Sequence, residues 1–435
     1  MKKSTLRSTF LFLLIFIPVM ADQITGYMQQ ELEMNLSVSQ IVKGIYTAIF
    51  IFYVLIYRPE NFIIISLFFI TFILNVATSL IHSYNWSAGL LNDVIFFSKI
   101  MTFPLTYFVF KNLINRYPAF FKNYFVSMYL GLFIIVLIAI VISPLGYGNN
   151  NYQQIEGEPA YGYKGYFIAG NELSALYILI YTFWCFHFYY KSTNLIKTFI
   201  AILLGLVLAG LIVTKTALIS FIVITLLTPI MLGHFLNKAE KSLLPLVIYI
   251  GKLIKVLAFL CVLSLTVLIV IFRERIDSNI ERMSENFEKA ESFNSFMLSG
   301  RDDRFQQSIV TYTEHYTWSQ KLFGGGWEYP QSYIQSHFLD IGTSEVDYLD
   351  ILVSYGAFGV LIIYGFWFFI LFYLIRKYYK KNVSVYIVPS LLSFSLIFFN
   401  SFLSGHIIYS ALTGFYLAIF INTIVIGNKF NLKSY

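Results

Sequence analysis

The sequence has few charged residues. Of its 435 residues, only 12% are Asp, Glu, Lys or Arg, whereas 58% are hydrophobic and 19% are aromatic. Soluble domains carry about 25% charged residues, so this chain lacks the polar side chains needed to cover a globular surface. The composition therefore excludes both a soluble enzyme and an intrinsically disordered chain.

The sequence also has few residues that bind metals or form disulfides. Its two cysteines, Cys185 and Cys261, both lie in apolar runs and indicate no disulfide framework. The 6 histidines show no spacing typical of metal ligands. Neither a Ser-His-Asp pattern nor a nucleotide P-loop is recognisable. We therefore expect a protein that uses no metal ion and no other cofactor.

Long apolar runs make up most of the chain. A transmembrane helix needs about 20 predominantly apolar residues, and hydropathy along the sequence predicts twelve such spans. They cover residues 6–21, 41–57, 62–83, 93–112, 122–143, 168–190, 197–213, 216–236, 245–272, 349–375, 383–402 and 407–426. The predicted fold class is an all-α polytopic membrane protein with about 12 transmembrane helices. The first span is either an uncleaved helix or a signal peptide that ends before Asp22.

The formal net charge of +7 is unevenly distributed along the chain. If the N-terminus is inside, most of the 30 basic residues fall in inner segments, whereas all of the 23 acids except Glu60 and Glu240 fall outside. Cytoplasmic loops are enriched in Lys and Arg, so we expect both termini to be cytoplasmic. The basic excess then reflects topology and indicates no nucleic-acid partner.

Two of the predicted outer segments are long. Residues 144–167 are rich in Gly, Asn and Tyr, and residues 273–348 form one large loop. Apolar residues recur at helical spacing twice within this loop, which predicts two amphipathic helices. The first stripe consists of Ile276, Ile280, Met283, Phe287 and Ala290, and the second of Phe305, Ile309, Tyr312 and Tyr316. The chain thus divides into helices 1–9 (1–272), the loop (273–348), and helices 10–12 with a cytoplasmic tail (349–435).

Several charged residues are predicted near the outer ends of spans. Lys215 directly follows the seventh span and is either an interfacial lysine or a phosphate contact that faces a cavity. Lys43 and Lys99 are expected to extend their side chains to the membrane interface. Glu172, early in the sixth span, either lines a cavity or caps its helix.

The densest polar cluster opens the second half of the large loop. Arg301 and Arg304 stand three residues apart at the expected start of a helix, so they share one side of it. Arginine is suited to bidentate recognition of phosphate oxygens. The alternative is local pairing with Asp302 and Asp303, either of which is also placed to cap the helix.

Further along the loop, the residues Gly324 to Gly326 predict a turn whose backbone approaches a ligand closely. His337 follows and is either an ordinary surface histidine or part of a site. Three acids, Glu345, Asp347 and Asp350, then lead into the tenth span. Glu345 is expected to lie beside Arg301 or to accept a proton.

The order of these features resembles the O-antigen polymerase and ligase superfamily, which consists of GT-C-like membrane glycosyltransferases. The resemblance covers the whole chain in topology, and its motifs cover roughly 299–360. It is carried by Lys215, Ser299-Gly300-Arg301, Leu322 to Gly326, Glu345 and Gly356-Ala357-Phe358-Gly359, with Asn171 similar to an asparagine that recurs at the head of a middle span.

The sequence departs from the ligase pattern at two positions. Ligases tend to have a histidine eleven residues before the first glycine of Gly-x-x-Gly, where this chain has Glu345, and His337 is eight residues too early. The arginine often found after the seventh span is Lys215 here, which keeps the charge but loses bidentate geometry. Both departures favour the polymerase, the Wzy type.

The resemblance implies a reaction on the periplasmic face of the bacterial inner membrane. A growing glycan moves from its undecaprenyl-diphosphate carrier onto the non-reducing sugar of a new lipid-linked repeat unit, without a metal ion. A separate co-polymerase usually regulates chain length. The alternatives are an O-antigen ligase that acts on lipid A core, a flippase or transporter of lipid-linked sugars, and a structural scaffold.

This hypothesis assigns roles to the candidate residues. The developing negative charge of the diphosphate is stabilised by Lys215, Arg301 and Arg304. A carboxylate base activates the acceptor hydroxyl, with Glu345 as first choice and Asp347 or His337 as reserves. The cavity is shaped by Asn171, Gly324, Gly326, Gly356 and Gly359. Candidates for stacking on sugar faces are Tyr312, Tyr316, Trp318, Trp327 and Tyr333.

Overall fold

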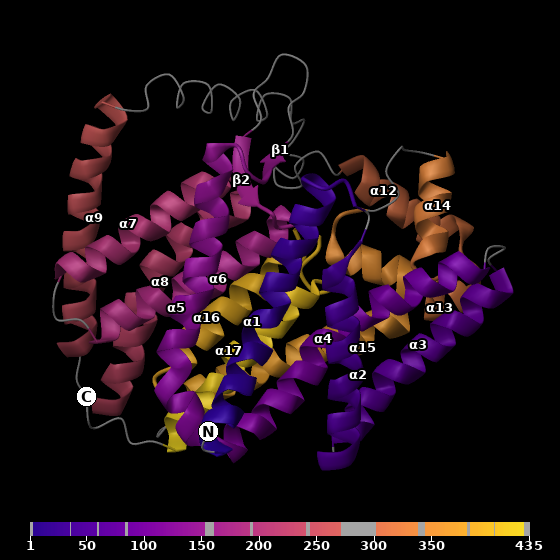
Figure 1. Cartoon of the computed structure of the whole chain (residues 1–435), viewed down its shortest axis with the longest axis horizontal. Coiled ribbons are helices and arrows are strands. Elements are labelled where there is room, and N and C mark those ends of the chain that lie inside the picture. Colours follow the sequence, from indigo (N-terminus) through magenta and orange to yellow (C-terminus); the bar gives the residue numbers. More distant parts are fainter. Residues whose placement is uncertain are drawn as a thin grey trace.

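The computed structural model describes residues 3–34, 36–58, 61–82, 86–152, 161–191, 195–240, 244–270, 302–337, 344–380, 383–403 and 405–429. These residues are mostly helical, and the long helices lie side by side in one bundle (Figure 1). The C-terminal helices run between helices from the first half of the chain. The expectation of a helical polytopic membrane protein is therefore confirmed.

Nine helices in the described ranges are long and apolar enough to cross a membrane. They are α1 (Lys3–Gln30), α2 (Val38–Tyr57), α3 (Phe62–His82), α4 (Trp86–Arg116), α5 (Pro118–Ile142), α6 (Gly170–Lys191), α7 (Leu195–Ile212), α8 (Lys215–Glu240) and α15 (Asp347–Tyr378). Three further helices occupy the other predicted spans: α9 (Leu244–Val270), α16 (Ile387–Asn400) and α17 (Ala411–Lys429). The total of twelve spans stays a prediction, because α16 and the apolar part of α17 are shorter than a full span.

The helices α4, α6 and α17 form the centre of the bundle. In both α4 and α6, 78% of the apolar span is buried, whereas in α2 only 17% is buried. α17 packs along α4 and also contacts α6. On α2, Ile41, Ile45 and Ile49 stand one turn apart and are each more than half exposed. An exposed isoleucine stripe of this kind suits contact with lipid acyl chains, so α2 belongs to the periphery.

One end of the bundle carries a β-hairpin and three short helices. The predicted loop 144–167 contains an antiparallel hairpin of β1 (Asn149–Tyr152) and β2 (Tyr161–Gly165). The short helices α12 (Asp302–Val310) and α14 (Glu328–His337) lie at the upper right of Figure 1, and α13 (Trp318–Phe323) lies below them. We call this end of the bundle the hairpin end.

The second predicted amphipathic helix is present but ends earlier than expected. Its described part runs from Asp302 to Val310, continues into a π-helical turn over Thr311–His315, and ends there. Tyr316 has an extended backbone, with φ −80° and ψ 135°, so it leaves the helical stripe. The first predicted amphipathic helix, around Ile276, lies outside the described residues.

Candidate functional site

An ion pair between α12 and the chain before α15 lies at the hairpin end. The Nη1 atom of Arg304 is 2.7 Å from Oε1 of Glu345. Both side chains keep partial exposure, 23% for Arg304 and 30% for Glu345. The predicted neighbour of Glu345 was Arg301, which lies outside the described residues. The structure thus pairs the candidate base with an arginine of the same predicted cluster.

The backbone at Glu345 is held in an unusual conformation. Its φ is +55°, a region that non-glycine residues rarely adopt. The preceding residue, Ser344, is fully buried and donates from its N–H and its hydroxyl to Oδ1 of Asp350, over 3.0 and 2.7 Å. On the other side, a Cβ at Gly405 would lie 2.6 Å from the carbonyl carbon of Glu345. Such strained residues persist only where the surroundings hold them and often mark functional sites.

The two acids that follow Glu345 are anchors of the fold. Asp347 is fully buried, and its Oδ2 accepts the N–H groups of Ile407, over 3.0 Å, and Ile408, over 2.7 Å. Asp350 is also buried, and its Oδ2 accepts the hydroxyl of Tyr409 over 2.9 Å. A buried carboxylate requires such donors to offset its lost hydration. These contacts tie the start of α15 to the segment between α16 and α17, and they leave Glu345 as the solvent-accessible acid of the three.

The segment 400–410, between α16 and α17, was not singled out from the sequence. Asn171, at the start of α6, donates its side-chain amide to the carbonyl of Gly405 over 2.9 Å. The neighbouring Glu172 accepts the hydroxyl of Ser410 over 2.8 Å. The next residue after Gly405, His406, has a φ of +65°. A polar Gly-His pair between two apolar spans on the predicted outer side was the signal that could have identified this segment.

Lys215, the predicted phosphate contact, is placed beside the same segment. It is the first residue of α8, and the following Thr216 donates its hydroxyl to Oδ1 of Asn400 over 3.2 Å. Residues from α6, α8 and α15 thus meet at 400–410. Asn171, Lys215, Glu345 and Asp347, which lie far apart in the sequence, are brought to one end of the bundle by this segment.

The glycine-rich turn of Gly324 to Gly326 packs against a break in α15. Gly356 has φ +67° and ψ −174°, which interrupts the helix there. The interruption frees the carbonyls of Val353 and Ser354, and the N–H groups of Gly325 and Gly326 donate to them, each over 3.1 Å. Buried carbonyls need such replacement donors. The turn therefore completes the hydrogen bonding of the broken helix.

Close approach explains why glycine occupies both sides of this contact. A Cβ at Gly324 would lie 1.9 Å from the carbonyl oxygen of Ser354, and a Cβ at Gly356 would lie 2.4 Å from the carbonyl carbon of Leu322. The Asn75 side chain, from α3, bonds the carbonyl of Phe323 over 3.0 Å. The predicted turn is confirmed, and it approaches the protein's own backbone.

The structure also places three further candidate residues, of which two are glycines in close contact with neighbouring side chains. Gly326 has φ +81°, and a Cβ there would lie 2.6 Å from the hydroxyl of Ser79. Gly359 lies in α15 beneath the side chain of Tyr355. His337 is the last residue of α14.

Asp93 is a buried acid outside the predicted set of site residues. It lies on α4, is 4% exposed, and accepts the N–H of Trp327 over 2.5 Å just before α14 begins. The adjacent Asn92 donates to Oε2 of Glu328 over 2.6 Å. A carboxylate at a helix N-terminus satisfies otherwise unpaired N–H groups, so α4 holds the start of α14.

The predicted sugar-stacking aromatics differ in burial. Trp327 is half-buried and stacks on Phe96 with ring centroids 3.7 Å apart. Tyr316 is 5% exposed and donates its hydroxyl to the carbonyl of Val353 over 2.8 Å. Burial raises the pKa of Tyr316 well above its usual value, so the hydroxyl stays protonated as a donor. Trp318, in contrast, is 81% exposed, which leaves its ring available to a ligand.

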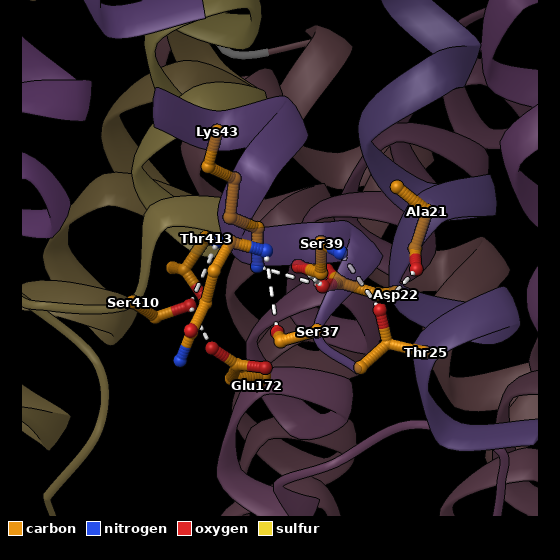
Figure 2. Close-up of polar contacts among 10 residues, drawn as sticks. Ala21, Asp22, Thr25, Ser37, Ser39, Lys43, Glu172, Ser410 and Thr413 are labelled. Atoms are coloured by element: carbon orange, nitrogen blue, oxygen red, sulfur yellow. Dashed lines mark hydrogen bonds and ion pairs between the residues drawn. The ribbon is translucent and has the colours of Figure 1, made fainter. Parts of the chain in front are cut away.

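A second charged cluster connects α1, α2 and α6 (Figure 2). Nζ of Lys43 is 2.7 Å from Oδ1 of Asp22, and the two side chains are 17% and 2% exposed. Ser39 also donates its hydroxyl to Asp22, and its N–H donates to Thr25 over 2.7 Å. The prediction that Lys43 extends to the membrane interface is therefore wrong, because its ammonium group pairs with a buried carboxylate one helix away.

The cluster is electrically balanced and reaches the 400–410 segment. Glu172 lies close enough to interact electrostatically with Lys43. Lys99, on α4, interacts in the same way with Glu172, Lys43 and Asp22. Through its bond to Ser410, Glu172 joins the cluster to the start of α17 (Figure 2). Ionisable groups at membrane depth are costly and are retained where they pair, so this cluster braces the helices around 400–410.

Within the described ranges, no group of three or more His, Cys, Asp or Glu residues is arranged to hold a metal ion. A scan against models of protein families and a search of curated proteins found no match to the chain. Its function is therefore inferred from the site itself and from the motifs that the sequence contains.

Proposed function

We propose that the chain is an O-antigen polymerase, or a polymerase of a related surface polysaccharide, in the bacterial inner membrane with both termini cytoplasmic. It transfers a growing glycan from undecaprenyl diphosphate to the non-reducing end of a lipid-linked repeat unit. The observation that carries the proposal is the Arg304–Glu345 ion pair, an accessible base beside an accessible cation at the hairpin end. In glycosyl transfer from a lipid diphosphate, a base activates the acceptor hydroxyl and a cation stabilises the leaving group, and each lowers the barrier.

Glu345 acts as the general base in this proposal. Its carboxylate removes the proton from the acceptor hydroxyl as that oxygen attacks the anomeric carbon of the growing glycan. The bond between the anomeric carbon and the diphosphate oxygen breaks, and the electron pair leaves with undecaprenyl diphosphate. The proton stays on Glu345 until the product departs. Its strained backbone, held by Ser344 and Gly405, fixes the direction of the carboxylate.

Arg304 stabilises the leaving group. Before substrate binds, Arg304 and Glu345 satisfy each other over 2.7 Å. An arriving diphosphate attracts the guanidinium, which offers five donors in a planar fork, and this frees the carboxylate for the acceptor. Lys215, at the start of α8, and Arg301, which directly precedes the described residue Asp302, add positive charge for the same diphosphate.

Asp347 is less suited to proton transfer than Glu345. Both oxygens of Asp347 accept backbone N–H groups at zero exposure, so this carboxylate anchors 405–409. Glu345, in contrast, combines partial exposure with a cationic neighbour. His337, on α14, stays a reserve base in the proposal. The proposed partners are undecaprenyl-diphosphate-linked oligosaccharides, membrane lipids and a chain-length-regulating co-polymerase.

The proposal is tested by deleting the gene and separating the cell-surface polysaccharide on a gel. Loss of a polymerase leaves lipid A core that carries one repeat unit and no ladder. Loss of a ligase strands long polymer on its lipid carrier beside bare core, and loss of a flippase traps single units on the cytoplasmic face. An unchanged ladder contradicts the proposed function.

A further inference from the structure

An apolar groove opens at the end of the bundle opposite the Arg304–Glu345 pair. α15 begins near that pair, at Asp347, and reaches the groove with its last turn at Tyr378. The groove has a volume of about 500 Å³, within the range of roughly 300–1,000 Å³ typical of small-molecule sites. Its lining comes from α8, α9, α15 and α16 and from Tyr379, which directly follows α15, and it includes Ile230, Met231, His234, Ile375 and Tyr378.

At the floor of the groove, the side chains contact one another and the backbone of the protein. Tyr378 donates its hydroxyl to the carbonyl of Met231 over 3.0 Å, and its ring lies against His234 with centroids 6.1 Å apart. Leu391 is 8% exposed. The rim, in contrast, is open, since Ile230 is 40% exposed and Ile375 is 37% exposed. Such an apolar rim on the outside of a membrane bundle faces acyl chains.

The end of the groove carries a concentration of positive charge. Lys238 donates its ammonium to the carbonyl of Tyr379, which lines the groove, and lies 5.2 Å from the centre of that ring. Arg376 and Lys377 stand in the last turn of α15, and Lys380 follows directly. The sequence places one acid nearby, Glu240 at the end of α8. With four basic residues and one acid, this region carries a net positive charge.

We propose that this groove binds one acyl chain of an anionic glycerophospholipid, with the lipid phosphate at Lys238 and Arg376. Basic pockets between transmembrane helices on the cytoplasmic side bind anionic head groups, and the basic residues here belong to predicted inner segments. A lysine ammonium has three donors, so Lys238 can hold both the Tyr379 carbonyl and a phosphate oxygen. A zwitterionic lipid matches the apolar lining but not the charge, which makes the anionic lipid the better occupant.

Native mass spectrometry of the purified full-length chain tests this proposal. Phosphatidylglycerol and phosphatidylcholine with identical acyl chains are titrated separately, and the dissociation constant of the first bound lipid is measured. We expect tighter binding of phosphatidylglycerol. A Lys/Arg near an anionic lipid surface contributes about 1 kcal/mol, or about 5-fold in affinity, so Lys238→Gln with Arg376→Gln should weaken its binding roughly 25-fold.

Two further variants separate this groove from other lipid contacts. Lys111→Gln removes an exposed lysine of α4, near that helix's own end, and should leave the phosphatidylglycerol affinity unchanged. Ile230→Trp fills the open rim and should weaken the binding of both lipids. Equal affinity for the two lipids, or an unchanged affinity in the Ile230→Trp variant, overturns the proposal. A dimer mass that Ile230→Trp abolishes also overturns it, because the groove would then hold a second copy of the chain. No outcome depends on polymer synthesis.

Discussion

The break in α15 makes a sharp prediction for Gly356→Ala. At φ +67° and ψ −174°, this backbone lies in a region that is essentially restricted to glycine. An alanine Cβ there would lie 2.4 Å from the carbonyl carbon of Leu322 and 2.6 Å from the nitrogen of Gly324. Both atoms belong to backbone, which cannot rotate away as a side chain does. The turn and the helix must therefore separate.

The expected loss of stability follows from these contacts. The unfavourable backbone region costs about 1–3 kcal/mol. Separation also removes two hydrogen bonds, from Gly325 to Val353 and from Gly326 to Ser354, each of which contributes about 1 kcal/mol. We therefore expect Gly356→Ala to lower the free energy of unfolding by about 3–5 kcal/mol, measured by denaturant titration of the purified protein in detergent micelles.

The same helix offers a matched control. A Cβ at Gly365 would have no atom within 4 Å, and alanine is favoured over glycine inside a helix by roughly 1 kcal/mol. Gly365→Ala should therefore be neutral or slightly stabilising. If Gly356→Ala is as stable as Gly365→Ala, the glycine-rich turn does not pack into a break in α15, and the reasoning about both motifs fails.

The remaining predictions concern charged side chains. Glu345→Gln and Arg304→Gln should each abolish the polysaccharide ladder at normal membrane abundance; a ladder with Glu345→Gln but none with Glu345→Ala shows that the residue binds substrate without taking a proton. Asp347→Asn should reduce abundance as well as the ladder, because charge-assisted bonds to backbone N–H groups contribute about 1.5–3 kcal/mol each; normal abundance on an immunoblot argues against an anchoring role. Asp22→Asn should lower the free energy of unfolding by about 3 kcal/mol, because it leaves the buried charge of Lys43 without its carboxylate. In the same denaturant titration, the double variant Asp22→Leu with Lys43→Met should recover most of that loss, and equal stability of the two variants refutes the pairing.

Sequence patterns identified many residues of the candidate site, but they did not show which of those residues contact one another. Glu345 was recognised because three acids stand where a span begins, and the arginines because two of them share one side of a helix start. Arg304 and Glu345 belong to the hairpin end and form the observed pair. The segment 405–409 was missed because its role depends on backbone N–H groups that bind Asp347, some 60 residues earlier. No local periodicity records such a contact.

The sequence by itself determined the membrane character of this protein, since apolar length is a local property that each segment carries alone. It also determined that a helix covers Phe305 and Ile309 and that Gly324 to Gly326 form a turn. The tertiary structure decided what these elements touch. Lys43 pairs with Asp22 instead of reaching the interface, and Gly356 breaks a helix that hydropathy treats as continuous. Ion pairs and close backbone contacts depend on groups far apart in the chain, so only packing in three dimensions brings them together.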